Sequence, residues 1–184
     1  MYGPEIKVKV KGFKVRLRPH RPEDAQQLVK MLGNPKVNRY LASHTPPSEI
    51  AELAWIEARA TDRNTRGWTV EVDGQCVGSV GFDKIDWPNG TATVGIFIGK
   101  PKLWGNGITT AIAKALAHHA FIEMGVRKLK SGYLAPNVAS GRVQQSIGLV
   151  EVGRWHAEFW CEGAWVDLVN TELMRDDYLA SLRD

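Results

Sequence analysis

The chain is poor in cysteine, with only 2 in 184 residues, and it has no long apolar run. Cys76 and Cys161 form neither a CxxC pair nor a Cys/His cluster, which excludes a zinc site and a thioredoxin-like redox motif. We expect both thiols to be small buried groups within strands. No apolar stretch approaches the roughly 20 residues that span a bilayer, and the N-terminus lacks the apolar core of a signal peptide. We therefore expect a cytoplasmic protein without membrane contact.

The remaining composition is typical of a globular domain. Hydrophobic residues make up 43% of the chain and charged residues 24%, which excludes a disordered or collagen-like chain. The length suits one domain, and because no internal repeat or low-complexity linker divides the sequence, we expect a single domain over residues 1–184. The net charge of +4 favours an anionic partner without naming it.

Hydrophobic periodicity predicts a mixed α/β architecture. Apolar residues that alternate with polar ones indicate strands, and a spacing of three to four residues indicates helices. Asp73-Gly74 is a strong hairpin turn between two of the strands. The predicted strands lie within residues 6–19, 67–72, 75–85, 91–99, 128–134, 150–161 and 164–174, and the predicted helices within 22–33, 48–62, 107–124 and 137–147.

A basic segment near the N-terminus has two interpretations. Lys7, Lys9 and Lys11 alternate with valines, and the alternation resumes after Gly12. The segment could form a surface that faces nucleic acid, or its lysines could protect the edge of a sheet against pairing with other chains. Because no aromatic residues are interleaved with the lysines, the sequence favours edge protection and makes nucleic-acid binding the secondary interpretation.

The stretch from Val94 to Gly107 carries the clearest chemical signal. An apolar strand leads into a glycine-containing loop that leads directly into a helix. Gly105 and Gly107 allow a tight turn with exposed amides at a helix N-terminus, where the unpaired N–H groups and the helix dipole favour a phosphate. Lys100 and Lys102 add positive charge, and threonines follow in the first turn. The pattern predicts a cradle for a diphosphate.

Two common phosphate-binding motifs do not fit this loop. The P-loop sequence with its Gly-Lys-Ser/Thr end occurs nowhere in the chain. The Rossmann fingerprint requires a third glycine where Thr110 stands, and an acidic residue about 20 positions further on, where the chain is basic. A nicotinamide or flavin dinucleotide is therefore not expected. A glycine-rich connection without any ligand stays open at this point.

Several elements together resemble one family. The segment Lys102–Gly107 is similar to the phosphate loop of the GNAT superfamily of N-acetyltransferases, and its Trp-Gly-x-Gly form is similar to the RimJ/RimL branch. The pattern of Asn137, Ser140 and Val143, followed by Ile147-Gly148-Leu149, resembles a second element of that branch. Matching features near both ends extend the resemblance over residues 14–175: Val15-Arg16-Leu17-Arg18-Pro19 and Gly163-x-x-x-Asp167.

The resemblance implies a fold, a cosubstrate and a set of site residues. It implies a mostly antiparallel central sheet flanked by helices, which splays between Val94–Gly99 and the strand near residue 130 to admit acetyl-CoA. An amide of Phe97–Gly99 would bind the oxyanion, and Ser140 would contact the CoA sulfur. Asn137 would hold the pantetheine or the surroundings of Ser140, and it is also the expected N-cap of its helix. No metal is implied. The implied contacts with acetyl-CoA are Phe97, Ile98, Lys102, Leu103, Trp104, Gly105, Asn106, Gly107, Ile108, Thr109, Asn137 and Arg142.

The chain departs from the family pattern at two catalytic positions. Thr93 stands where family members often carry a glutamate base, and Gln144 stands where many carry a tyrosine acid. A glutamine amide has no titrating proton to donate. The alternative groups that could remove the amine proton through water are Asp83, Asp86, His156 and Glu158.

Histidine and tryptophan add minor expectations. His118 and His119 are adjacent on a helix and therefore do not form a metal pair, whereas His119 and Glu123 have the spacing of an i,i+4 contact. His20 and His44 could line an acceptor site. Tryptophans are more numerous than one core needs. Some of them are expected to line the acceptor cleft, although core packing explains most of them equally well: Trp55, Trp68, Trp87, Trp155, Trp160 and Trp165.

The leading functional prediction is an acetyl-CoA-dependent N-acetyltransferase that acts on a primary amine by direct attack in a ternary complex. A protein N-terminus of the ribosomal-protein type is the favoured acceptor. A small-molecule amine, such as a polyamine, an antibiotic or an amino acid, is the alternative. A third hypothesis, motivated by Thr93 and Gln144, is a module that binds acyl-CoA without turnover, or a basic RNA-associated protein. A homodimer is possible by analogy with the branch.

Overall fold

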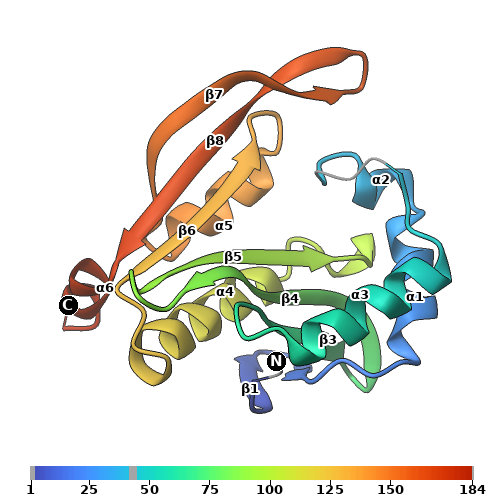
Figure 1. The fold of residues 1–184 in the computed structure, drawn as a ribbon, viewed down its shortest axis with the longest axis horizontal. Coiled ribbons are helices and arrows are strands. Elements are labelled where there is room, and N and C mark those ends of the chain that lie inside the picture. Colours follow the sequence, from blue (N-terminus) through green and yellow to red (C-terminus); the bar gives the residue numbers. More distant parts are fainter. Residues whose placement is uncertain (1–2, 42–44, 184) are drawn as a thin grey trace.

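One eight-stranded sheet organises the computed structural model, which describes residues 3–41 and 45–183 (Figure 1). The strands follow the order β1-β2-β3-β4-β5-β6-β8-β7, and all neighbours are antiparallel except β5 and β6. The predicted mixed α/β fold with a mostly antiparallel sheet is confirmed. The strands are β1 Ile6–Val10, β2 Phe13–Arg18, β3 Arg66–Val72, β4 Gln75–Asp86, β5 Thr91–Ile98, β6 Lys128–Leu134, β7 Val150–Cys161 and β8 Ala164–Met174.

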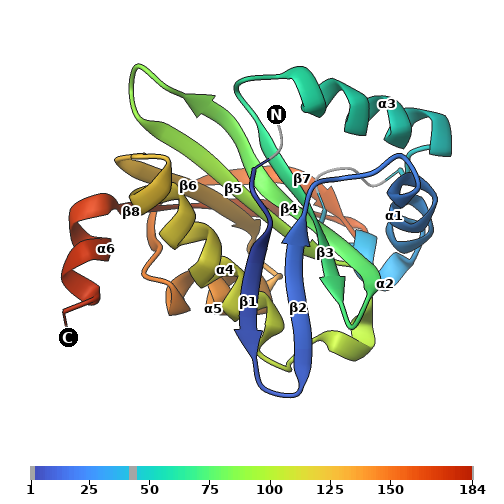
Figure 2. The same cartoon turned by 90° about the horizontal axis from the view of Figure 1, so that it is seen from below.

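Helices cover both faces of this sheet (Figure 2). The larger core lies between the sheet and α4, whose Ile112 and Leu116 are fully buried. A smaller core lies under α1 and α3 and includes Leu28 and Ile56. The helices are α1 Asp24–Leu32, α2 Pro35–Asn38, α3 Glu49–Thr61, α4 Ile108–His118, α5 Val138–Ser146 and α6 Arg175–Ser181, with a 3-10 turn η1 at Pro101–Leu103 and a π-helical turn η2 at His119–Glu123.

The helix prediction was incomplete at two places. The short α2 begins at Pro35, where Asn34 accepts a hydrogen bond from Lys36 N at 3.0 Å as the N-cap. The predicted helix within residues 22–33 ends just before this segment, and the sequence pattern predicts no second helix there. The C-terminal α6 was also not predicted, although Asp176 and Asp177 stand in its first turn, where acidic residues favour a helix.

Both cysteine thiols are buried, which confirms the expectation for them. The tryptophans exceed what the core takes up, as expected: Trp68 is a core residue, and the other five named above are partly or largely exposed. Trp155 (57% exposed), Trp160 and Trp165 lie on the β7–β8 hairpin, which projects from the body in Figure 1. No helix among the described residues is long and apolar enough to cross a membrane.

Candidate active site

The site begins where two neighbouring strands stop pairing. β5 and β6 are paired in parallel from Thr91 to Thr93, and the last pair joins Thr93 to Lys130. Beyond it only the Ser131 hydroxyl reaches across, donating to the Val94 carbonyl at 3.1 Å. β5 nevertheless continues to Ile98 against β4 on its other side. The two strands therefore diverge (Figure 1), and one edge of β5 from Gly95 onward has no strand partner among the described residues.

The backbone of β5 directs one particular amide toward this divergence. The Gly99 amide donates to the Val77 carbonyl of β4 at 2.7 Å. Because successive amides of a strand point in opposite directions, the Phe97 amide also points toward β4, whereas the Ile98 amide points toward β6. The Trp104 indole donates to the Ile98 carbonyl at 2.8 Å and so fixes the end of the strand. Within Phe97–Gly99, the segment expected to bind the oxyanion, Ile98 is therefore the residue whose N–H points into the gap between β5 and β6.

The loop after β5 presents unpaired amides to the outside. Gly105 and Gly107 have φ angles of 78° and 75°, the left-handed conformation that glycine adopts without strain. Gly107 is the N-cap of α4, no side chain caps this end, and the first helical bond runs from Ala111 N to Gly107 O at 3.0 Å. The amides of residues 108–110 therefore lack partners within the helix. A Cβ on either glycine would meet nothing within 4 Å, so the loop is open to an anion.

The other loop residues divide into anchors and exposed groups. Leu103 packs against the larger core and Ile108 is buried, so both hold the loop in place. Asn106 donates from its side-chain amide to the Lys102 carbonyl at 3.3 Å, which closes the loop on itself. The Lys102 side chain is exposed, and Thr109 is half-buried in the first helical turn. The loop thus offers amides, a hydroxyl and a cation together.

A cavity of about 490 Å³ adjoins the loop on the side of the β3–β4 turn. Lys100 lies in its wall and donates from Nζ to the Gln75 side-chain oxygen at 2.7 Å. This bond holds Lys100 toward the β3–β4 turn. Of the two lysines expected on the approach to the phosphate cradle, Lys102 is the exposed one, and its ammonium group has no ion-pair partner among residues 3–41 and 45–183.

Helix α5 carries the residues expected near the sulfur. The Asn137 side chain is the N-cap and accepts from Ser140 N at 3.2 Å. The Gln144 side chain donates to the Gly132 carbonyl at 3.1 Å and to the Ser140 hydroxyl at 3.2 Å, and it accepts from the Thr171 hydroxyl at 2.6 Å. Gln144 therefore ties α5 to β6 and β8. Since Ser140 Oγ acts as the acceptor in this network, its own O–H remains available as a donor.

Two neighbours of Ser140 on α5 differ in environment. Arg142 is exposed, and the described part of the chain supplies it with no ion-pair partner. Gly141 is buried, and a Cβ there would lie 2.9 Å from the ring of Tyr133. The half-buried Tyr133 was not singled out from the sequence. Its only signal was the glycine inside a helix, where glycine costs about 1 kcal/mol relative to alanine.

Comparison with known proteins is now decisive. A family model described as the acetyltransferase (GNAT) domain matches residues 14–150. The chain belongs to the GNAT acetyltransferases. It is accordingly an N-acetyltransferase, and acetyl-CoA is the cosubstrate of this family. The unpaired amides and the free lysine of the loop suit the phosphates of that cosubstrate.

Individual relatives are distant in sequence but cover nearly the whole chain. "Uncharacterized N-acetyltransferase p20" of Bacillus licheniformis is 22% identical over 90% of this chain and 95% of that protein. "Putative ribosomal N-acetyltransferase YdaF" of Bacillus subtilis is 25% identical over 89% of this chain and 93% of that protein. The same fold occurs in spermidine N-acetyltransferase of Vibrio cholerae, with a TM-score of 0.83 and 19% identity, over 90% of this chain and 98% of that one. It also occurs in RimJ of Mycobacterium smegmatis, with a TM-score of 0.80 and 19% identity, over 97% of this chain and 94% of that one.

One candidate base lies beside the strand divergence. Asp83 of β4 is directly opposite Thr93, the position at which GNAT members often carry glutamate. Its carboxylate forms an ion pair with Arg59 of α3, whose guanidinium also lies 4.5 Å from the centre of the Trp55 ring. The next residue on this face, Gly95, is exposed in the middle of the sheet. An acceptor amine can therefore approach β5 from the α3 side, near Asp83.

The other candidate bases lie further out. Asp86 is held in the β4–β5 turn by Asn89, whose hydrogen bonds lower the pKa of the carboxyl group. His156 is 82% exposed on the projecting hairpin, 3.4 Å from Asp167, and Glu158 is exposed on the same hairpin. In the register of β4 and β5, Asp83 is the residue opposite Thr93, whereas Asp86 lies opposite Thr91.

The histidines have separate positions. His20 is buried, and burial lowers its pKa to about 4, so its ring is neutral at neutral pH. The Thr69 hydroxyl donates to Asp24 at 2.7 Å and therefore accepts from His20 Nδ1 at 2.8 Å. This bond ties His20 to β3, and its ring lies edge-on to that of Trp55 of α3, 5.6 Å between centres. His44 lies outside the described residues. The predicted contact between His119 and Glu123 is confirmed at 2.7 Å, and the described residues contain no cluster of His, Cys, Asp and Glu that could hold a metal.

Proposed function

We propose that this GNAT enzyme transfers the acetyl group of acetyl-CoA to the α-amino group of a polypeptide. The name of the relative YdaF refers to ribosomal N-acetylation, which supports a protein acceptor. The competing acceptor is a polyamine, since structures with the same fold include spermidine N-acetyltransferase. Both acceptors require the same chemistry at the thioester and differ in the charge that they bring to the cleft.

The charge around the exposed Gly95 is the observation that favours a peptide. A polyamine carries several ammonium groups, and its recognition requires several carboxylates that are free to pair with them. On this face Asp83 is paired with Arg59, and Glu172 accepts a hydrogen bond from Lys128 at 2.7 Å. Lys130 is exposed beside them. A peptide with a single N-terminal amine meets these charges at less cost than a polycation.

The geometry assigns a role to each group near the thioester. Acetyl-CoA supplies an activated carbonyl, which the acceptor amine attacks as the C–N bond forms and the C–S bond breaks. The Ile98 amide points into the divergence and donates to the oxygen that becomes negative, a contribution typically worth about 3 kcal/mol to the transition state. The Ser140 hydroxyl, which Gln144 leaves free to donate, stabilises the departing thiolate. Asp83 accepts the ammonium proton through water.

Acetyl transfer to a panel of amines tests the acceptor. Peptides with different N-terminal residues, the same peptides with blocked N-termini, and spermidine are each incubated with the enzyme and acetyl-CoA. We expect thiol release and one acetyl group on the α-amine of free peptides, located by mass spectrometry, and none on blocked peptides. Faster transfer to spermidine than to every peptide would replace the peptide by a polyamine as acceptor.

A further inference from the structure

The strand register places like charges face to face near the N-terminus. In the antiparallel pair of β1 and β2, Lys7 lies opposite Arg16 and Lys9 lies opposite Lys14. Lys11 follows at the turn. Residues directly opposite each other in such a pair are about 5 Å apart, and like charges at this distance destabilise the pair. The ribbon therefore keeps an arrangement that costs stability when no anion is bound.

The acidic residues nearby neutralise the arginines but not the lysines. Arg16 Nε donates to Glu71 at 2.6 Å, and its other end lies 3.5 Å from Glu5. Arg18 is held by both Asp24 and Glu71, at 2.8 and 2.9 Å. The remaining cations have no ion-pair partner in the part of the chain that the structure describes: Lys7, Lys9, Lys11 and Lys14. Asp73, the other acid beside the ribbon, accepts from the backbone amide of Lys14.

Edge protection does not account for this pattern. β1 is the edge of the sheet, but β2 lies inside it between β1 and β3, where no protection against strand pairing is needed. Lys14 nevertheless adds a cation on β2 opposite Lys9. The segment 6–18 holds six basic residues and no acidic one, and without it the chain would carry 18 Lys and Arg against 20 Asp and Glu. The net positive charge of the protein thus resides in this ribbon.

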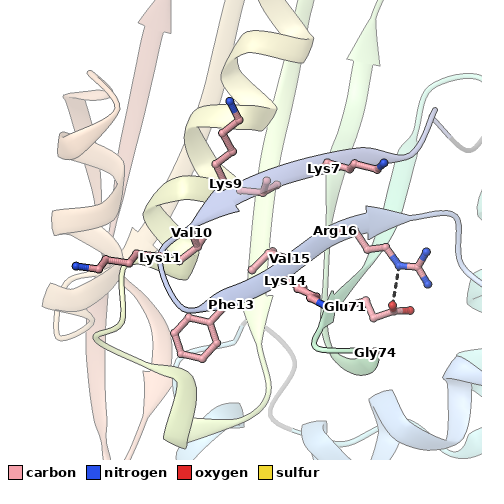
Figure 3. Close-up of a pocket in the computed structure, with 11 residues that line it drawn as sticks. Lys7, Lys9, Val10, Lys11, Phe13, Lys14, Val15, Arg16, Glu71 and Gly74 are labelled. Atoms are coloured by element: carbon pink, nitrogen blue, oxygen red, sulfur yellow. Dashed lines mark hydrogen bonds and ion pairs between the residues drawn. The ribbon is translucent and has the colours of Figure 1, made fainter.

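The charged face of the ribbon is hollowed by a groove of about 730 Å³ (Figure 3). The lining of this groove combines the four lysines, Arg16 and Glu71 with the apolar Val8, Val10, Phe13 and Val15. The groove reaches Gly74 in the β3–β4 turn, whose neighbours Asp73 and Gln75 line the cavity beside the acetyl-CoA loop. The opposite face of the same ribbon packs Val8 and Val15 into the core with α4, the helix that carries the phosphate cradle. The described residues of the ribbon include no largely exposed large apolar side chain that could enter a lipid layer.

We propose that this face binds the phosphodiester backbone of a nucleic acid, with Lys7, Lys9, Lys11 and Lys14 as the phosphate contacts. Such a backbone carries charge at regular intervals along its length, and lysines distributed over two strands can contact several phosphates at once. The aromatic ring beside the groove, Phe13, is half-buried against the core, and both arginines of the ribbon are paired with carboxylates. We therefore expect binding to be independent of base sequence. Release of counterions drives it and makes it strongly dependent on salt.

A pair of matched triple variants tests this assignment in the full-length protein. K7Q/K9Q/K14Q removes three cations from the ribbon, and K30Q/K36Q/K114Q removes three exposed lysines elsewhere, so the change in net charge is equal. Fluorescence anisotropy with a labelled single-stranded RNA, repeated from 50 to 300 mM salt, gives the affinity and its salt dependence. Single-stranded DNA, polyglutamate and anionic vesicles serve as the comparison ligands, and acetyl-CoA binding is measured in parallel.

We expect the ribbon variant to bind RNA at least tenfold more weakly, with the salt slope reduced by about 2, because each lost contact to a single strand contributes about 0.7. The control variant should stay within threefold of the wild type. Equal weakening by both triples, no RNA binding at 50 mM salt, or tighter binding of polyglutamate or vesicles than of RNA would each overturn the proposal. Retained acetyl-CoA binding by the ribbon variant separates this outcome from a failure of the acetyltransferase site.

Discussion

Replacement of Gly107 by glutamate is the sharpest test of the phosphate cradle. Gly107 is the N-cap of α4 and has a φ angle of 75°, and the space around a Cβ there is empty to 4 Å. A Cβ can therefore be added there without contacting any neighbour. The glutamate places a carboxylate beside the unpaired amides of residues 108–110, where we propose that the phosphates of acetyl-CoA bind.

The size of the effect follows from the charges. Two like charges 4 Å apart repel by about 1 kcal/mol in water and about 4 kcal/mol at an effective dielectric constant of 20. Gly107 is exposed, so the lower part of this range applies. A penalty of about 2 kcal/mol weakens binding roughly 30-fold. The left-handed backbone costs any non-glycine residue about 1–2 kcal/mol of folding stability, which affects the fold more than the binding.

Two control variants separate the effect of the added charge from that of the backbone strain. Gly107→Ala carries the backbone strain without the charge. Gly125→Glu carries both at a distant site, because Gly125 has a φ of 69° and an equally empty Cβ position. Isothermal titration with acetyl-CoA should show roughly 30-fold weaker binding for Gly107→Glu and changes below threefold for both controls. Binding by Gly107→Glu within threefold of Gly125→Glu would refute the cradle.

Three further predictions concern catalysis, stability and pH. Ser140→Ala should lower kcat at least tenfold with little change in the KM for acetyl-CoA, because it removes a donor to the thiolate; an unchanged kcat in a thiol-release assay would remove that role. Gln144→Ala should lower the free energy of unfolding in urea by about 2 kcal/mol, because it leaves the buried Thr171 hydroxyl without its acceptor. The control Gln145→Ala, at an exposed position, should lower it by under 0.5 kcal/mol. Equal losses in the two variants would contradict the bridging role of Gln144. The folded state lowers the pKa of His20 from 6.5 to about 4, so the unfolded chain takes up a proton first and the free energy of unfolding falls as the pH drops. Between pH 7 and 5 the free energy of unfolding of His20→Gln should fall by about 2 kcal/mol less than that of the wild type. Parallel plots of unfolding free energy against pH for the two proteins would argue against a neutral buried ring.

Features that depend on residues close together in the chain were predictable. The turn at Asp73-Gly74 occurs as expected, with φ angles of 50° and 82°. The glycine that starts α4 and the Asn137 cap of α5 likewise follow from a few adjacent residues. The missed α2 shows the limit of such rules. Proline after Asn34 marks the end of one helix, and the same asparagine and proline are also a favourable start for the next.

The acceptor side was less accessible to prediction because it combines distant segments. Asp83 was one of four possible bases in the sequence, and only the pairing of β4 with β5 places it opposite Thr93. The role of Gln144 was also hidden, since its partners Gly132 and Thr171 lie 12 and 27 residues away. In the sequence it was merely a residue that cannot act as an acid.

The amino-acid sequence was sufficient to identify the glycine loop, the asparagine cap and the family, because these features are encoded in short contiguous motifs. The place where β5 leaves β6, the direction of the Ile98 amide and the opposition of Lys9 to Lys14 depend instead on strand register. Register is set by how the sheet packs against α4 and by the neighbouring strands. A shift of one residue would turn every side chain to the other face, and no local pattern carries that information.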